Sequence, residues 1–187
     1  AEGTWGRDVA GRGISGTGST LAITQQYRAY IEDFIETHGV TSGVDAGSGD
    51  WSFSSAIEWG EASYLGIDIA SDVVAAVRRR HETGKIRFQV GDITDELPAA
   101  DLLISKDVLQ HLSNDLVRKF IRNNLRPGKY KWAILTNDRG SGNGDVASGG
   151  YRAIDLAAPP FAVSGLVDLP ITFDNESTKI TSLLDLT

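Results

Sequence analysis

The stretch Val44-Asp45-Ala46-Gly47-Ser48-Gly49-Asp50-Trp51 decides the fold of this chain. A short apolar lead ends in an acid, two glycines follow at alternate positions, and a helix-compatible segment runs from Ser52 to Trp59. Glycine lets a chain turn sharply and lets a ligand approach the backbone without a Cβ in the way. The amides that open a helix are unpaired donors with partial positive charge. The stretch therefore predicts a strand, a tight turn and a helix start, an arrangement able to grip a cofactor.

The composition indicates one ordinary domain. The chain has 187 residues, of which 41% are hydrophobic and 23% charged, and this is typical of a globular protein with a sizeable core. The formal net charge of -7 disfavours nucleic acid and favours a small-molecule partner. The lack of cysteine excludes disulfides, thiolate metal sites and a cysteine nucleophile. No apolar run approaches membrane-spanning length and no leader opens the chain, so the sequence predicts a cytoplasmic protein without membrane spans.

The first part of the chain divides into an arm and a helix. Residues 1–20 are rich in Gly, Ser and Thr and predict a flexible arm, whereas residues 21–187 predict a single domain. From Leu21 to about His38, apolar residues recur at steps of three and four, which predicts an amphipathic helix. Gly39 is then expected to end this helix as its C-terminal cap.

After the arm and helix, strands and helices alternate. Short apolar runs predict strands at Gly43–Ala46, Ser63–Asp68, Ile86–Gly91, Leu102–Ser105 and Trp132–Asn137. Longer segments predict helices at Ser52–Trp59, Ser71–Glu82 and Asp115–Leu125. A long connection over residues 139–164 precedes two apolar stretches, Leu166–Phe173 and Lys179–Leu186, that read as an antiparallel hairpin. The pattern predicts a Rossmann-like, doubly wound α/β sheet of seven strands, mostly parallel, with an antiparallel C-terminal hairpin strand.

Acidic residues end or follow successive strands. They are Asp45, Asp68, Asp92, Asp107 and Asp138. A single acid in such a place is often the cap of the next helix, but all five fall on one edge of a parallel sheet together with the glycine turn. Asp68 lies about twenty residues beyond the turn, where an acid accepts hydrogen bonds from both hydroxyls of a ribose. The sequence therefore predicts a site for a nucleoside cofactor at this edge.

Both dinucleotides and other nucleoside cofactors can bind their ribose to an acid in this position, and Asp45 distinguishes between these two classes of cofactor. A dinucleotide needs its diphosphate against the glycine turn, where the Asp45 carboxylate would repel it. Ser52 also stands where a dinucleotide motif has its third glycine. A cofactor that carries an ammonium and a sulfonium would instead be attracted to Asp45. S-adenosylmethionine is such a cofactor.

The chain resembles the class I S-adenosylmethionine-dependent methyltransferases over roughly residues 21–187. Asp45–Gly49 is similar to their first motif, Tyr64–Asp68 to their ribose-binding strand end, and Gly91–Ile93 to their adenine-binding pair. Asp101–Leu112 resembles their fourth strand and the turn after it, which commonly ends in a His such as His111. The sequence departs from the pattern at Asp50-Trp51, where a third small residue is often found.

This resemblance implies a set of cofactor-binding residues. They are Arg28, Asp45, Gly47, Ser48, Gly49, Trp51, Asp68, Ile69, Asp92, Ile93 and Lys106. In it, Asp45 and the glycine turn face the methionyl end, Asp68 binds the ribose, and Asp92 with Ile93 holds the adenine. Trp51 either packs on the cofactor or caps the pocket. Arg28 either pairs with the cofactor carboxylate or is a solvated helix charge.

Methyl transfer from a sulfonium is an in-line displacement, so the protein needs no covalent nucleophile. A base helps when the acceptor is a hydroxyl or a protonated amine, and His111 is the candidate, with packing or a helix-end role as the alternative. Substrate contacts are expected from strand ends and loops, at Asp107, Asp138, Arg139, Tyr151 and Arg152. No metal site is expected.

The sequence thus predicts an S-adenosylmethionine-dependent methyltransferase that moves a methyl group to a small or medium-sized acceptor. One alternative is a non-catalytic module that binds S-adenosylmethionine or another nucleotide. A second, disfavoured by Asp45 and Ser52, is an NAD-dependent oxidoreductase.

Overall fold

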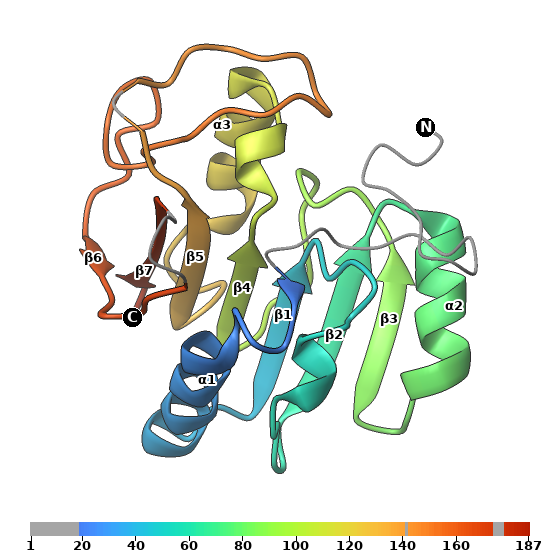
Figure 1. Ribbon diagram of the computed structural model, residues 1–187. Helices are drawn as coiled ribbons and strands as arrows, with labels where there is room; N and C mark the ends of the chain where they lie inside the picture. The colour runs from blue at the N-terminus through green and yellow to red at the C-terminus, as the bar shows by residue number, and fades with distance from the viewer. Residues whose placement is uncertain (1–18, 141, 174–177) are drawn as a thin grey trace.

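The computed structural model describes residues 19–140, 142–173 and 178–187, so the predicted arm falls outside it except for its last two residues. A seven-stranded sheet with the order β3-β2-β1-β4-β5-β7-β6 forms its centre (Figure 1). The strands are β1 Ser42–Ala46, β2 Ser63–Asp68, β3 Ile86–Val90, β4 Leu102–Lys106, β5 Trp132–Asp138, β6 Leu166–Asp168 and β7 Lys179–Asp185. β1 to β5 pair in parallel, and β7 pairs antiparallel with both β5 and β6. The predicted fold class and closing hairpin are confirmed.

Three α-helices and two short 3₁₀ turns accompany the sheet in the described residues. They are α1 Gln25–His38, η2 Ser54–Ala56, α2 Ser71–His81, η3 Leu109–His111 and α3 Asn114–Asn124. Gly39 adopts a left-handed φ of 59° and ends α1, as predicted. The helix begins at Gln25 instead of Leu21, because residues 21–24 form a turn in which Thr24 Oγ1 donates to the Thr20 carbonyl. Within the described residues, no helix is long and apolar enough to cross a membrane.

The helix predicted over Ser52–Trp59 is wrong, since only residues 54–56 form a single 3₁₀ turn. Trp51, Phe53, Ile57 and Trp59 are all buried, and such a set surrounds a helix instead of lining one face of it. Ser side chains also compete for the backbone here, as Ser55 Oγ donates to the Ser52 carbonyl. The glycine turn is therefore followed by an aromatic-rich loop that packs into the core.

The two faces of the sheet are covered differently. One face packs against α1 and α2 and is rich in aromatic residues, including Tyr27, Phe34 and Tyr64. The other face packs against α3 through Val117 and Phe120, together with part of the long connection between β5 and β6. That connection, drawn in orange in Figure 1, contains no helix in its described residues. Because β1 to β5 are parallel, their carboxyl ends all lie at the same edge of the sheet.

The link from β3 to β4 also lacks a helix, and one buried side chain holds it. Asn124, at the end of α3, donates through Nδ2 to the carbonyls of Ile93 and Asp95 at 3.1 and 3.0 Å. Its Oδ1 accepts the amide of Leu97 at 3.1 Å and Nζ of Lys129 at 3.0 Å. Asn124 is fully buried, so these bonds satisfy backbone groups that no helix pairs.

Replacing this residue tests the arrangement. We expect Asn124→Ala to lower the free energy of unfolding by about 2–4 kcal/mol, because it leaves several buried polar groups without partners. Its neighbour Asn123 donates one side-chain bond among the described residues, to the Thr94 carbonyl, so Asn123→Ala should cost about 1 kcal/mol. Urea denaturation of both variants measures the difference. Equal losses would contradict the role given to Asn124.

Candidate active site

The turn after β1 is shaped by the residues around it. Gly47 and Gly49 have φ angles of 92° and 55°, in the left-handed region that glycine enters without penalty. The amides of Gly47 and Ser48 both donate to the Ile67 carbonyl, at 2.8 and 3.1 Å. A Cβ on Gly47 would lie 2.3 Å from Cγ2 of Val108. Glycine at position 47 is therefore needed both for the turn and for the close approach of the segment after β4.

Asp68 ends β2 beside this turn. Its Oδ2 accepts the amide of Gly49 at 3.0 Å and its Oδ1 accepts the amide of Ala70 at 2.9 Å. A carboxylate has about four acceptor positions, so each oxygen retains capacity for a further donor. The next residue, Ile69, is 72% exposed, which is unusual for a large apolar side chain in a folded domain. The carboxylate of Asp68 and the exposed side chain of Ile69 are thus adjacent in sequence at the end of β2.

The predicted adenine pair is divided by the structure. Asp92 follows β3 at the same edge, where its Oδ1 accepts the amide and the hydroxyl of Thr94, each at 2.8 Å. Ile93, in contrast, is buried in the core that packs against α3, and its carbonyl is bonded to Asn124. The structure does not bring Ile93 to the site, and Ile69 is the apolar side chain exposed there.

Asp45 is a buried carboxylate on β1. It is 5% exposed and accepts a hydrogen bond from the Tyr64 hydroxyl at 2.7 Å. Burial raises the pKa of Asp45 to about 6, the Tyr64 hydrogen bond opposes the shift, nearby Asp68 adds to it, and Lys106 opposes it. A strongly shifted acid at the end of a parallel strand is typical of a functional site.

Two lysines and two carboxylates form an ion-pair cluster at the ends of β4, β5 and β7. Lys106 Nζ lies 2.5 Å from Asp107 Oδ2, and Lys179 pairs with the other Asp107 oxygen and lies 3.7 Å from Asp138 Oδ1. The side chains of Lys106 and Lys179 are 2% and 9% exposed. The ring centroid of Phe173 lies 5.5 and 5.8 Å from the two ammonium groups. Asp107 and Asp138, both predicted at the site, thus lie together.

His111 adjoins this cluster at the end of η3. Its Nδ1 lies 2.8 Å from the Gly150 carbonyl, which can only accept, so the proton of the neutral ring resides on Nδ1. Gln110 Oε1 accepts the Asp138 amide at 2.7 Å, which orients its Nε2 toward Nε2 of His111, at 3.4 Å. Burial lowers the pKa of His111, against the opposing effects of the Gly150 carbonyl and nearby carboxylates. Nε2 is therefore the basic nitrogen.

Tyr151 lies beside His111, with their ring centroids 5.8 Å apart. The Tyr151 hydroxyl donates a hydrogen bond to the Asp138 carboxylate.

Trp51 is placed in the core and not at the site. It is 7% exposed, and its ring centroid lies 5.6 Å from that of Tyr64 and 5.2 Å from that of Phe88. The residue has a left-handed φ of 59°, and its amide donates to the Ser48 carbonyl. The prediction that Trp51 packs on the cofactor or caps the pocket is therefore corrected: it supports the sheet beneath the turn.

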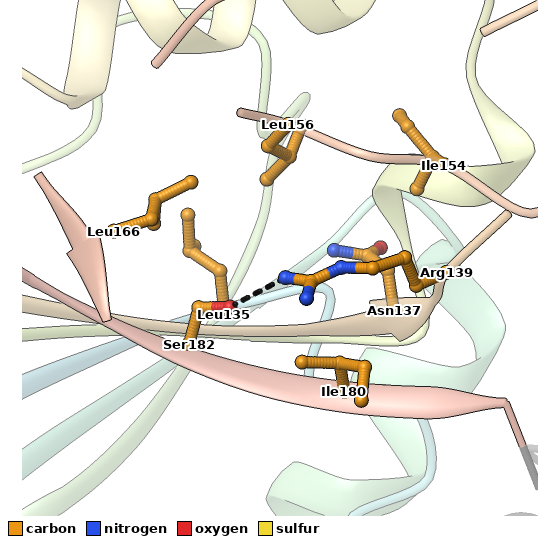
Figure 2. Close-up of a pocket in the computed structure, with 8 residues that line it drawn as sticks. All are labelled: Leu135, Asn137, Arg139, Ile154, Leu156, Leu166, Ile180 and Ser182. Atoms are coloured by element: carbon orange, nitrogen blue, oxygen red, sulfur yellow. Dashed lines mark hydrogen bonds between the residues drawn. The ribbon is translucent and has the colours of Figure 1, made fainter. Parts of the chain in front are cut away.

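Two predicted substrate residues also have structural partners. Arg139 forms an ion pair with Asp168 and donates to Ser182, so it joins the end of β5 to β6 and β7. It lies beside a small cavity that is lined by residues of β5, β6, β7 and the long connection (Figure 2). Arg152 is 9% exposed and donates to the Leu112 carbonyl at 2.6 Å, which ties the long connection to the start of α3. The sequence indicates where these arginines occur but not which way they point.

Sequence reasoning missed Tyr64, Gln110, Lys179 and Phe173. A signal existed for Lys179, because the antiparallel pairing of β7 with β5 sets it directly opposite Asp138. Tyr64 lies on β2 opposite Gly43, two residues before Asp45, and the alternation of strands sends both side chains to the same face. Gln110 and Phe173 lie in non-repetitive segments that give no such signal.

Comparison with known proteins agrees with this geometry. Residues 44–128 match a family described as "Methyltransferase domain", and this segment includes the glycine turn, the acids after β1, β2 and β3, and η3 with α3. The match covers less than half of the chain, and over this segment the chain is similar to a methyltransferase domain. No curated protein matches this chain.

Several solved methyltransferases share the fold. The N-methyltransferase NodS from Bradyrhizobium japonicum WM9, solved with S-adenosyl-L-homocysteine, is 14% identical with a TM-score of 0.65 over 88% of this chain and 87% of its own. The mitomycin 7-O-methyltransferase MmcR is 17% identical with a TM-score of 0.65 over 88% of this chain and 54% of its own. The magnesium protoporphyrin IX methyltransferase ChlM from Synechocystis PCC 6803, solved with SAH, is 13% identical with a TM-score of 0.61 over 88% of this chain and 84% of its own. At these identities the likeness shows the fold alone, and the chain spans about half the length of MmcR.

The raised pKa of Asp45 predicts how stability depends on pH. Because the folded-state pKa of about 6 lies above the unfolded value, the native state retains a proton that the unfolded chain releases. Stability from this group is therefore lost as the pH rises from about 4 to about 6, by an amount on the order of 3 kcal/mol. Asp45→Asn should remove this loss, since its amide oxygen still accepts the Tyr64 hydroxyl.

We expect Asp45→Asn to match the wild type near pH 4 and to be more stable at pH 7, by about 2–3 kcal/mol. Urea denaturation across this range measures it. The exposed Asp33 serves as control, and Asp33→Asn should leave the pH profile unchanged. A variant less stable than the wild type at pH 7 would contradict the assignment.

Proposed function

We propose that this chain is a methyltransferase that uses S-adenosylmethionine and transfers the methyl group directly to a small or medium-sized acceptor. The observation that carries the proposal is the convergence, at one edge of the sheet, of the glycine turn with Asp45 and Asp68. The family match and the solved relatives that bind S-adenosylhomocysteine support the same cofactor. The negative net charge supports a small-molecule acceptor over nucleic acid.

The residues at this edge fit such a cofactor. Gly47 lets the turn after β1 pack tightly against Val108, which fixes the backbone beside Asp45 and Asp68. Asp68 retains acceptor capacity for ribose hydroxyls, and the exposed Ile69 offers an apolar surface to the adenine, with Asp92 beyond it. Asp45 supplies negative charge for the methionyl ammonium or sulfonium.

Arg28 suits the cofactor carboxylate. Its Nη2 donates to the Leu21 carbonyl, and among the described residues its buried Nε has no hydrogen-bond acceptor. The preceding residue, Tyr27, packs against Phe53 and Phe173, the two rings that flank Lys106, so this turn of α1 lies against the methionyl side of the proposed site. A buried donor without a partner is costly, and a carboxylate would satisfy it.

When bound, S-adenosylmethionine supplies an electrophilic methyl group on a positively charged sulfur. The task of the protein is then to hold an acceptor about 3 Å from that carbon and in line with the C–S bond. His111 provides a neutral imidazole whose Nε2 can take the proton of a hydroxyl or an ammonium acceptor. Tyr151, 58% exposed, and Asp138 border the same place and would contact the acceptor.

Two other functions remain distinguishable. A non-catalytic module that only binds S-adenosylmethionine would hold the cofactor but give no product with a panel of acceptors. An NAD-dependent oxidoreductase is disfavoured because the buried Asp45 would face the diphosphate. The solved relatives include both an N- and an O-methyltransferase, so the acceptor atom is to be found by turnover and not from the fold.

The cofactor site is tested by calorimetric titration of S-adenosylmethionine and S-adenosylhomocysteine. We expect micromolar binding to the wild type and a weakening of tenfold or more in Asp68→Ala, about 1.4 kcal/mol, because the ribose loses its acceptor. Asp72→Ala, an exposed acid on α2, should bind as the wild type does. Lack of binding by the wild type would overturn the proposed function.

The base is tested with His111→Asn. The asparagine amide can still donate to the Gly150 carbonyl, but the basic nitrogen is lost, so kcat should fall by about 10²–10⁴-fold while cofactor affinity is unchanged. In the wild type, kcat/KM should fall as the pH drops through a pKa below the usual 6.5 of histidine, and the variant should lack this decline. His38→Asn is the control. Unchanged turnover would exclude His111 as the base.

A further inference from the structure

Lys106 is a buried cation with an unusual environment. Its side chain is 2% exposed, and its Nζ lies 2.5 Å from Asp107 Oδ2. The same ammonium lies over the rings of Phe53 and Phe173, 5.1 and 5.5 Å from their centroids. Carboxylates and aromatic faces are the groups that bind organic cations in proteins. In this site a lysine of the chain itself already occupies such surroundings.

The position of Lys106 places it on the methionyl side of the proposed cofactor site. β4 lies next to β1, with Ile104 opposite Asp45, and Ser105 Oγ donates to the Ala46 carbonyl at 3.0 Å. Lys106 follows two residues after Ile104, so its side chain projects to the same face as Asp45. The ribose acid Asp68 lies on the opposite side of β1, on β2. In the proposed binding mode, Lys106 would therefore be nearer to the methionyl end of the cofactor than to its nucleoside end.

The local charges are close to balanced. Within the described residues, this end of the sheet gathers the ammonium groups of Lys106 and Lys179 and the carboxylates of Asp45, Asp107 and Asp138. In a partly desolvated site, a change of one unit alters the affinity for a charged ligand far more than it would in water. Affinity for a neutral ligand of the same shape changes much less.

We propose that Lys106 sets the balance between the charged methyl donor and the neutral product, by disfavouring S-adenosylmethionine relative to S-adenosylhomocysteine. The inference rests on the proposed function, since it needs both ligands to bind at this edge. Its consequence is that the charged donor binds less tightly, relative to the neutral product, than it would without the lysine charge. Asp107 acts in the opposite sense, because its carboxylate offsets the lysine charge.

The two ligands isolate this effect. They differ by one methyl group and one positive charge at sulfur, so the ratio of their dissociation constants removes every contribution that they share. A substitution that merely loosens the site changes both constants together and leaves the ratio unaltered. Only a residue that senses the sulfur charge moves it.

The first variant is Lys106→Met, which retains the length and apolar stem but removes the charge. Calorimetry should show the ratio Kd(S-adenosylmethionine)/Kd(S-adenosylhomocysteine) falling by about tenfold, or 1.4 kcal/mol. The matched control is Lys129→Met, a buried lysine before β5 at the opposite edge of the sheet, bonded to Asn124. There the ratio should remain that of the wild type.

A second variant tests the opposite sign. Asp107 has a left-handed φ of 60°, a conformation that asparagine also adopts readily, so Asp107→Asn removes the charge with little backbone cost. Its ratio should rise, by up to about tenfold, because Lys106 is less compensated. This measurement remains decisive even where Lys106→Met fails to fold.

The outcomes separate the two proposals. If the wild type binds neither ligand, the proposed function fails, and this inference with it. If both ligands bind and the ratio is the same in the wild type, Lys106→Met and Asp107→Asn, the inference fails while the cofactor site stands. Opposite shifts in the two variants support it, and shifts of the same sign overturn it.

Discussion

The structure depends on the Asp68 carboxylate, which receives the amides of Gly49 and Ala70 and so fastens the turn after β1 to the end of β2. In a nucleotide-binding turn that opens a helix, the helix itself orders the amides. Here only a three-residue 3₁₀ segment follows, so that support is missing. The Ile67 carbonyl and the close packing of Val108 take its place. The carboxylate that we propose to bind ribose therefore also shapes the turn, so on that proposal ligand binding and local order would be coupled at Asp68.

The missing helices explain where the buried polar groups lie. Where β3 joins β4 and β5 joins β6, the described backbone has no helix to pair its amides and carbonyls. Asn124 satisfies the first link, Asn143 donates to the Asp155 carbonyl within the second, and Arg152 ties the second link to the Leu112 carbonyl before α3. The cost of burying these side chains is offset by the backbone groups that they satisfy. Rigid side-chain ties thus let the loops hold a defined shape around the strand ends.

The sequence was informative where one physical rule acted alone. Short apolar runs located every parallel strand to within a residue at each end, and Gly39 marked the end of α1. It failed where packing overrode the pattern, as in the aromatic-rich segment after Trp51, whose side chains enter the core from a loop. The acids of the site could be placed because strand ends share one edge. The directions of Arg139 and Arg152 could not, because their partners come from elements distant in the chain.

Burial of charge at the strand ends argues that this edge serves a ligand and not the fold. Asp45 is held at a raised pKa by burial, and Lys106 at a lowered one, so both weaken the folded state relative to apolar residues of similar size. The lysine is compensated by Asp107 and the rings of Phe53 and Phe173, which limits the cost without removing it. A core built only for stability would replace these charges with hydrocarbon. Their concentration beside the glycine turn, at the border of the aromatic-rich core, fits a site whose electrostatics are set for a charged ligand.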